Sequence, residues 1–246
     1  MTYAFVFAAI LFGGMIEFYS FFNSGKYSPN KSTGYFIGLV LFVLTFLVSA
    51  GYLNNEWYLA LLPLILMIFA SEMYRKKDSP IENVAITVFP ILYIALPISI
   101  INLLVFPEGK EILFQPNVFI AVLVIIWIYD SGAYIFGVSF GKHRLFERIS
   151  PKKSWEGAIG GTIVAIVSSY FIQLFVPEIG LVHWMVLSLL IAISATFGDL
   201  TESLIKRTVG VKDSGNFFPG HGGFLDRFDS LLFVVPVVVL YLKIIS

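Results

Sequence analysis

Long apolar runs separated by short polar stretches dominate the sequence. Each run is close to the roughly 20 residues that a helix needs to cross the hydrocarbon core of a bilayer. Apolar and polar positions do not alternate within the runs, so we predict helices, which satisfy their own backbone hydrogen bonds in lipid. The predicted segments are 3–22, 34–53, 57–74, 85–106, 117–139, 158–177, 182–201 and 228–245.

Composition supports a membrane protein. Of the 246 residues, 58% are hydrophobic and 13% are charged, and the mean hydropathy is +0.87, whereas soluble domains carry about 25% charged residues. We predict an all-α, polytopic integral membrane protein with about eight transmembrane helices and a polar active-site cavity facing the cytosol. One transmembrane domain, 1–246, would hold N-terminal helices (1–110) and a catalytic part (117–246). The chain has no cysteine, which excludes disulfides and thiolate metal sites.

Basic residues gather in alternate loops. Loops 23–33, 75–84, 140–157 and 202–227 together carry 14 of the 16 lysines and arginines. The positive-inside rule places these loops in the cytosol and both termini outside. One interpretation is that the basic residues only set this topology. The density of charge in the last two loops favours a further role there.

The stretch 198–230 is the most polar part of the chain. Charges beside a bilayer are costly, so such a concentration indicates a functional site. Asp199 closes one predicted segment, and Asp226 and Asp229 open the last one, where they would share a face if helical. Asp130 lies inside segment 117–139, so three helix ends would bring carboxylates together. The alternative is that these acids only pair with neighbouring bases to close helix ends.

Two other acids and two glycine pairs carry weaker expectations. Glu72 is expected to pair with a nearby base, and Glu17 to line a cavity. Gly34-x-x-x-Gly38 and Gly157-x-x-x-Gly161 have the spacing of helix contact faces, although such matches also arise by chance.

Clustered carboxylates without cysteine and with few histidines suit a hard cation such as Mg²⁺. Mg²⁺ takes one or two protein carboxylates and leaves its other positions to water and substrate phosphates. Interleaved bases suit phosphate oxygens, and the combination is that of phosphoryl or nucleotidyl transfer. A His221-Gly222-Gly223 turn could approach a phosphate or a base closely. The interleaved bases are Lys206, Arg207, Lys212 and Arg227.

The run from Ser203 to Asp229 reads Ser-x-Ile-Lys-Arg-x4-Lys-Asp-x-Gly-x2-Phe-Pro-x-His-Gly-Gly-Phe-x-Asp-Arg-x-Asp. It resembles the signature of phosphatidate cytidylyltransferases (CDP-diacylglycerol synthases) without departure. The stretches 130–142 and 150–157 are similar to the same family. The likeness is loose before about residue 128, and a hydrophobic segment that the family usually has before the first one is not seen here.

The resemblance implies a reaction of CTP with phosphatidate that gives CDP-diacylglycerol and pyrophosphate, with Mg²⁺ and room for a second cation. It implies Asp226 and Asp199 as metal ligands, with Asp229 and Asp213 next. Lys206, Arg207, Lys212 and Arg227 would hold phosphates. Which basic stretch binds CTP and which the lipid headgroup stays open. The implied substrate-binding residues are Asp130, Tyr134, Gly141, Lys142, Ser150, Lys152, Lys153, Ser154, Trp155, His221, Gly222 and Gly223.

The expected partners are therefore CTP, phosphatidate and the bilayer of a bacterial inner membrane. No nucleic-acid partner is expected, and a homodimer is one arrangement open to a membrane enzyme of this size. Alternatives are a CTP-using polyprenol or phytol kinase, or a synthase for an ether lipid. An ion-coupled transporter with sites at Asp130 and Asp199 is the alternative from another class, but it would show repeated halves, which we do not find.

Overall fold

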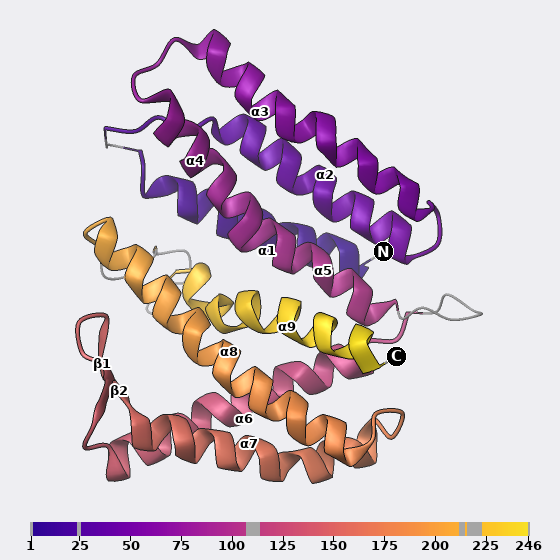
Figure 1. Ribbon diagram of the computed structural model, residues 1–246, viewed down its shortest axis with the longest axis vertical. Coiled ribbons are helices and arrows are strands. Elements are labelled where there is room, and N and C mark those ends of the chain that lie inside the picture. Colours follow the sequence, from indigo (N-terminus) through magenta and orange to yellow (C-terminus); the bar gives the residue numbers. More distant parts are fainter. Residues whose placement is uncertain (1, 24–25, 107–113, 212–214, 216–222, 246) are drawn as a thin grey trace. The chain divides into compact units, whose positions relative to one another are not determined.

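The computed structural model describes residues 2–23, 26–106, 114–211, 215 and 223–245. By its internal contacts the chain divides into two compact units, one of 1–114 with 213–225 and one of 115–212 with 226–246. Both units are helical (Figure 1). Within the described ranges, seven helical spans of 19–28 residues are long and apolar enough to cross a membrane. These spans confirm the prediction of an all-α, polytopic membrane protein.

The first unit consists of helices joined by short turns. A proline at position 90 interrupts the helical hydrogen bonding, and the chain passes through the π-helical turn η2 without leaving the span 80–105. The predicted single segment at 85–106 therefore contains two α-helices. The elements are α1 (Thr2–Ser20), α2 (Lys31–Ser49), η1 (Asn55–Ala60), α3 (Leu61–Arg75), α4 (Pro80–Pro90), η2 (Ile91–Ala95) and α5 (Leu96–Val105).

Small residues allow α1 and α2 to pack closely. A Cβ atom at Gly34 would overlap the Tyr19 side chain, and one at Gly38 would lie 2.7 Å from the Met15 sulfur. This glycine pair is thus a helix contact face, as its spacing suggested. Buried polar groups are also paired across the unit, since the Tyr19 hydroxyl donates to the Thr87 carbonyl at 2.7 Å.

The acids of the first unit have different surroundings. Glu72 is buried and forms a 2.7 Å ion pair with Arg75, which confirms the expected local pairing. Glu17 is also buried, and its Oε2 accepts a 2.6 Å hydrogen bond from the Leu225 amide. Glu17 therefore holds the last residue of the 213–225 segment to α1, inside the same unit.

The second unit packs three long helices and a shorter one. Gly161 of α7 lies against α6, because a Cβ atom there would come within 2.7 Å of the Tyr129 carbonyl oxygen. Gly157 makes a similar approach to the Ala133 carbonyl, so the second glycine pair is also a contact face. The elements are α6 (Asn117–Phe140), β1 (Arg144–Phe146), β2 (Ser150–Ser154), α7 (Trp155–Phe175), α8 (Leu181–Thr208), η3 (Leu225–Arg227) and α9 (Asp229–Ile245).

The structure differs from the sequence predictions at three places. α8 continues to Thr208, beyond the predicted end at 201, because its last polar turns are stabilised by a Glu202–Lys206 ion pair four residues apart. The loop at 140–157 contains an antiparallel hairpin of two short strands. Asp226 lies in the 3-10 turn η3 and not on the helix that Asp229 begins, so these two acids do not share a helix face.

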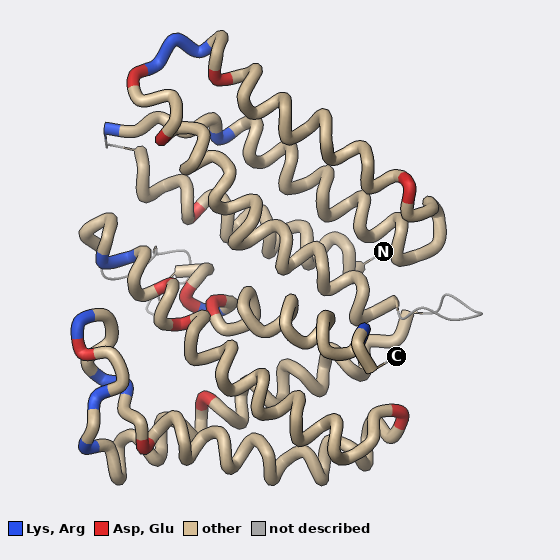
Figure 2. Tube along the Cα trace, in the orientation of Figure 1, with Lys and Arg blue, Asp and Glu red and all other residues tan. Residues whose placement is uncertain are grey.

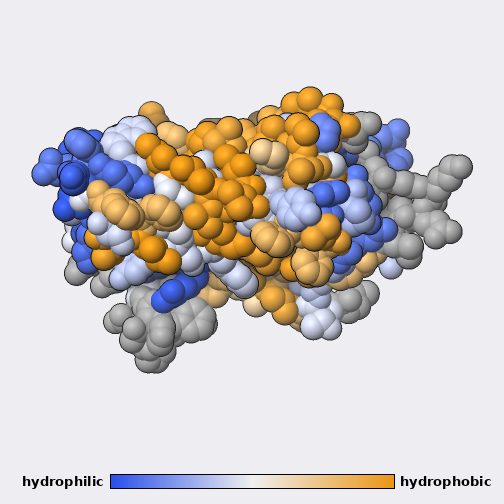
Figure 3. Space-filling model, turned by 90° about the horizontal axis from the view of Figure 1, so that it is seen from below, coloured by the Kyte–Doolittle hydropathy of each residue, from blue (hydrophilic) through white to orange (hydrophobic). Residues whose placement is uncertain are grey.

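Charge and hydropathy follow the helix axes. In each unit most lysines and arginines gather at one end of the helices (Figure 2). Figure 3 shows a face with hydrophobic side chains over its middle and hydrophilic ones toward its two ends. On α7, the side chains of Ile159, Ile163, Val167 and Phe171 are exposed. Exposed apolar side chains on a spanning helix are the surface that lipid covers.

Candidate active site

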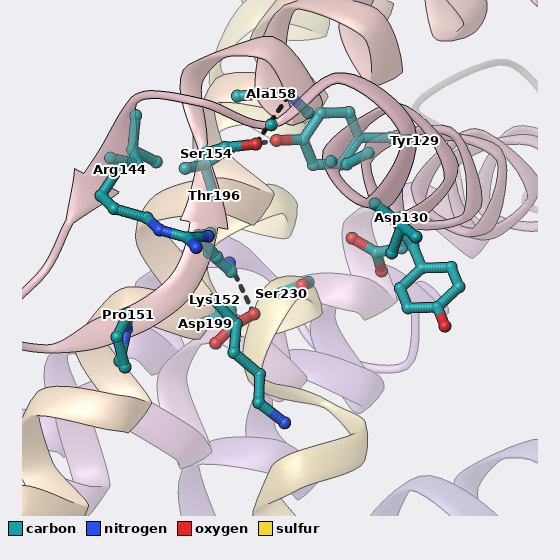
Figure 4. Close-up of a pocket in the computed structure, with 18 of the residues that line it drawn as sticks. Tyr129, Asp130, Arg144, Pro151, Lys152, Ser154, Ala158, Thr196, Asp199 and Ser230 are labelled. Atoms are coloured by element: carbon teal, nitrogen blue, oxygen red, sulfur yellow. Dashed lines mark hydrogen bonds and ion pairs between the residues drawn. The ribbon is translucent and has the colours of Figure 1, made fainter.

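A cavity of about 680 Å³ lies in the second unit, bordered by α6, the β1–β2 hairpin, the last part of α8 and the start of α9 (Figure 4). Its lining combines acids, bases and hydroxyl groups, which is unusual for a chain with so few charged residues. The polar side chains that line it are Tyr129, Asp130, Tyr134, Arg144, Lys152, Lys153, Ser154, Thr196, Asp199, Asp226, Asp229 and Ser230.

Four aspartates border this cavity from four different elements. Asp130 lies in the second half of α6, and Asp199 lies between two and three turns before the end of α8. Asp226 belongs to η3, and Asp229 is the first residue of α9. Carboxylates that share one cavity repel each other unless cations lie between them. The lining therefore favours cations.

The β1–β2 hairpin supplies positive charge to the same cavity. The Lys153 ammonium lies 2.5 Å from the Asp199 carboxylate. Lys152 and Arg144 also line the cavity, and Arg144 projects from the hairpin toward its middle (Figure 4). Bases from the hairpin thus face acids from the helices, as a site for an anionic ligand with a cation requires.

Hydrogen bonds close the base of the hairpin. The Glu156 carboxylate accepts from the amides of Lys142 and His143 at 3.1 and 3.2 Å and contacts His143 Nδ1 at 2.6 Å. In return, the Trp155 amide donates to the His143 carbonyl at 2.9 Å. The residues before β1 and those after β2 are therefore tied together, which fixes the direction in which the hairpin leaves the helices.

Two small residues shape the junction of the hairpin with α6 and α7. The Ser154 hydroxyl caps α7 by accepting from the Gly157 amide at 3.2 Å. A Cβ atom at Gly141 would overlap the Gly137 carbonyl and lie 2.8 Å from the Ser154 hydroxyl. Glycine at position 141 therefore lets α6 end directly against the cap of α7.

A second ion-pair cluster lies behind the cavity acids. Lys206 contacts the carboxylates of Glu202 at 2.6 Å and Asp226 at 2.5 Å. The Lys206 side chain is largely buried, and Glu202 is 3% exposed. In this structure Lys206 thus forms ion pairs with two carboxylates. Its role in holding phosphates stays a prediction.

The other predicted site residues lie outside this cavity or outside the described part of the chain. Lys142, Ser150, Trp155, Arg207 and Arg227 are described but do not line the cavity. Gly223 belongs to the first unit, where it is buried. The predicted residues that lie outside the described ranges are Lys212, Asp213, His221 and Gly222.

The donor set fits Mg²⁺ in an open site. Among the described residues, no three carboxylate or imidazole side chains are grouped closely enough to hold a metal alone. Mg²⁺ needs only one or two carboxylates when substrate phosphates and water complete its shell. The Lys153 ammonium already occupies a cation position beside Asp199. The cavity carboxylates therefore attract a cation but leave positions that water or a phosphate can fill.

Comparison with known proteins identifies the family. The sequence model of the cytidylyltransferase family matches residues 1–245. The chain belongs to this family.

Several relatives are named phosphatidate cytidylyltransferase. The chain is 46% identical to the one from Bacillus subtilis (strain 168) over 124 residues, which are 50% of this chain and 46% of that protein. It is 44% identical over 131 residues to the one from Thermotoga maritima, and the match covers 51% of this chain and 48% of that protein. It is 46% identical over 120 residues to the one from Haemophilus influenzae, and these residues are 47% of this chain and 42% of that protein. The matched region is thus about half the length of these curated relatives.

Sequence reasoning missed several groups at or near this candidate site. Arg144 was assigned only to the basic loop, and Glu156 was not given a role. The Tyr129 hydroxyl contacts the Thr196 hydroxyl at the cavity wall, and neither position carried a signal. Glu202 did carry a sequence signal, because it precedes Lys206 by four residues, which is the spacing of an ion pair along a helix.

Proposed function

We propose that this chain is a phosphatidate cytidylyltransferase, which transfers CMP from CTP to phosphatidate and forms CDP-diacylglycerol and pyrophosphate. The observation that carries the proposal is one cavity in which aspartates of the helices face Arg144, Lys152 and Lys153 of the hairpin. Membership of the cytidylyltransferase family and the names of the relatives support the choice of reaction.

The proposed step is a single in-line displacement. A phosphate oxygen of phosphatidate forms a bond to the α-phosphorus of CTP, and the bond from that phosphorus to the oxygen bridging to the β-phosphate breaks. Pyrophosphate leaves with the electron pair. Because the attacking oxygen is already anionic, no strong general base is needed, and no histidine is found among the described residues that line the cavity. Positioning and charge neutralisation then supply most of the catalysis.

The bases of the hairpin have the reach and charge to hold phosphates. Arg144 can bind two phosphate oxygens at once through its planar guanidinium, and Lys152 adds a second positive charge. Lys153 can leave Asp199 and bind the departing pyrophosphate. Asp199 and Asp226, with Asp229, would hold Mg²⁺, which when bound neutralises negative charge on the phosphate oxygens.

The arrangement in the membrane follows from the charges. Since lysines and arginines gather at the helix ends near this cavity, the positive-inside rule supports a cytosolic active site with both termini outside. CTP and pyrophosphate would then exchange with the cytosol, while the acyl chains of phosphatidate stay in the bilayer. Bacterial relatives support a location in the inner membrane.

Pyrophosphate release by the purified full chain in liposomes tests this function. Release from CTP is expected to require both phosphatidate and Mg²⁺, and to stop with EDTA. Asp226→Asn should abolish it in a folded protein, whereas Asp78→Asn, at an exposed position of the first unit, should leave it unchanged. Release without phosphatidate, or near-normal turnover of Asp226→Asn, would contradict the proposal. Polyprenols and ether lipids in place of phosphatidate test the related acceptors.

A further inference from the structure

One face of α1 holds a distant part of the chain against the helix, inside the first unit. Gly13, Gly14 and Glu17 share this face, because residues three and four apart in a helix are neighbours. A Cβ atom at Gly13 would lie 3.3 Å from the Phe224 ring, and one at Gly14 would lie 3.4 Å from the Leu225 side chain. The two glycines therefore let Phe224 and Leu225 pack closely on α1.

Glu17 adds a hydrogen bond to this packing. Its Oε2 accepts from the buried Leu225 amide at 2.6 Å, across 208 positions of the sequence. Leu225 begins the turn η3, and the first amides of a helical turn have no acceptor within that turn. A buried amide without an acceptor is costly, so α1 supplies what η3 itself does not. Either charge state of the carboxyl can accept this bond.

The same side chain also contacts the segment 213–225 near its start. A Cβ atom at Gly215 would overlap Oε1 of Glu17, so the glycine backbone lies directly against the carboxyl group. Glu17 is only 7% exposed. One buried side chain of α1 thus contacts this segment at Gly215 and at Leu225, and the segment belongs to the run that resembles the family signature.

The Leu225 backbone bears on the active site through the next residue. Asp226 follows Leu225 directly and lines the cavity. Because consecutive Cα atoms are held about 3.8 Å apart, a shift of the Leu225 backbone also shifts Asp226. A misplacement of about 1 Å in a catalytic group can lower a rate about 100-fold. The hydrogen bond from Leu225 to Glu17 therefore has a consequence for turnover.

We propose that Glu17 is a positioning residue, which fixes the backbone at Leu225 and so sets the place of Asp226. This inference rests on the proposed function, because it gives Asp226 a role in that reaction. Glu17 acts through the backbone of Leu225 and is not itself a catalytic residue.

Turnover by the purified full chain in liposomes, with CTP, phosphatidate and Mg²⁺, tests the proposal. Glu17→Leu removes the acceptor and keeps a side chain of similar size, and its kcat is expected to fall roughly 10–100-fold. The KM for CTP should stay within about twofold, because the hairpin bases proposed to hold phosphates are unchanged. Glu17→Gln keeps an oxygen that can accept the same bond and should keep kcat within about threefold.

Hydrogen exchange in detergent measures the contact without turnover. Glu17→Leu should lose a slowly exchanging amide in the peptide that contains Leu225, whereas Glu17→Gln should retain it. Tyr19→Phe is the matched control, because it removes another buried hydrogen bond of α1, the one to the Thr87 carbonyl. This variant should show wild-type exchange at Leu225 and wild-type kcat.

Several results would overturn the proposal. One is a folded Glu17→Leu protein with wild-type kcat or with unchanged exchange at Leu225. Another is an equal loss of kcat in Glu17→Leu and Tyr19→Phe, which would show a general loss of stability only. If Glu17→Leu does not fold, Glu17→Asp draws the acceptor back by one methylene, and an unchanged kcat in that folded variant overturns the proposal as well.

Failure of this inference differs from failure of the proposed function. A wild-type protein that forms no CDP-diacylglycerol would reject the reaction. Faster exchange at Leu225 in Glu17→Leu would then still support the hold of Glu17 on this backbone, and unchanged exchange would overturn it. A wild-type protein that forms the product, with kcat unaffected by Glu17→Leu, would reject the role of Glu17 alone.

Discussion

Replacing Lys153 with glutamine is expected to strengthen the binding of a divalent cation and to weaken the binding of CTP. The Lys153 ammonium lies 2.5 Å from Asp199, so a metal that uses Asp199 must first displace it. Without substrate, lysine and metal compete for the same carboxylate. Once the nucleotide is bound, the freed ammonium can hold a phosphate, and its loss should then raise the KM for CTP.

The size of the effect follows from the exposure of the pair. The two side chains are 28% and 36% exposed, so the pair is neither dry nor fully solvated. Exposed ion pairs contribute about 0.2–1 kcal/mol, and we take about 1 kcal/mol for this one. Because 1.4 kcal/mol corresponds to a factor of about ten, Mn²⁺ should bind about fivefold more tightly to Lys153→Gln.

Lys152→Gln is the matched control for this experiment. Lys152 lines the same cavity and carries the same charge, but it forms no ion pair with a described carboxylate. Both variants should raise the KM for CTP, and only Lys153→Gln should show the full gain in Mn²⁺ affinity, measured by titration in the absence of nucleotide. Equal Mn²⁺ constants for the two variants, or weaker binding by Lys153→Gln, would refute the competition.

Two further substitutions test the packing around the site. Gly161→Ala should destabilise the protein by about 1–3 kcal/mol, because the new methyl group overlaps the Tyr129 carbonyl. The control is Gly137→Ala, whose methyl group meets only ordinary contacts in the same helix pair and which should unfold at nearly the wild-type temperature. Equal losses of stability in the two variants would contradict the close packing. Glu156→Gln should raise the KM for CTP about threefold with little change in kcat, because it weakens the contact of the carboxylate with His143 that orients the hairpin. An unchanged KM would show that this contact does not orient the hairpin for binding.

Much of the fold could be predicted from hydropathy, because a run of about 20 apolar residues has few alternatives to a spanning helix. The end of α8 could not, since its last turns are polar and are held by the Glu202–Lys206 pair. The hairpin could not be predicted from the hydropathy pattern either. Its two short, polar strands have no apolar alternation, and one of them contains Pro151.

The acids of the candidate site could be predicted for the same reason that the helices could. A carboxylate at the end of a spanning helix stands out from its apolar neighbours, and Asp130, Asp199, Asp226 and Asp229 all border one cavity. The pairing of charges between different elements could not be predicted. Whether a lysine meets a phosphate or a carboxylate depends on the three-dimensional path of the chain, as Lys153 and Lys206 show.

The position of the label after reaction with radioactive CTP tests the central claim most directly. The purified chain in liposomes with phosphatidate and Mg²⁺ would receive CTP labelled either at the α-phosphate or at the γ-phosphate. Cytidylyl transfer predicts that the α-label enters the lipid and that the γ-label leaves as pyrophosphate. A γ-label in the lipid would mean that the chain is a CTP-dependent kinase and would contradict the account.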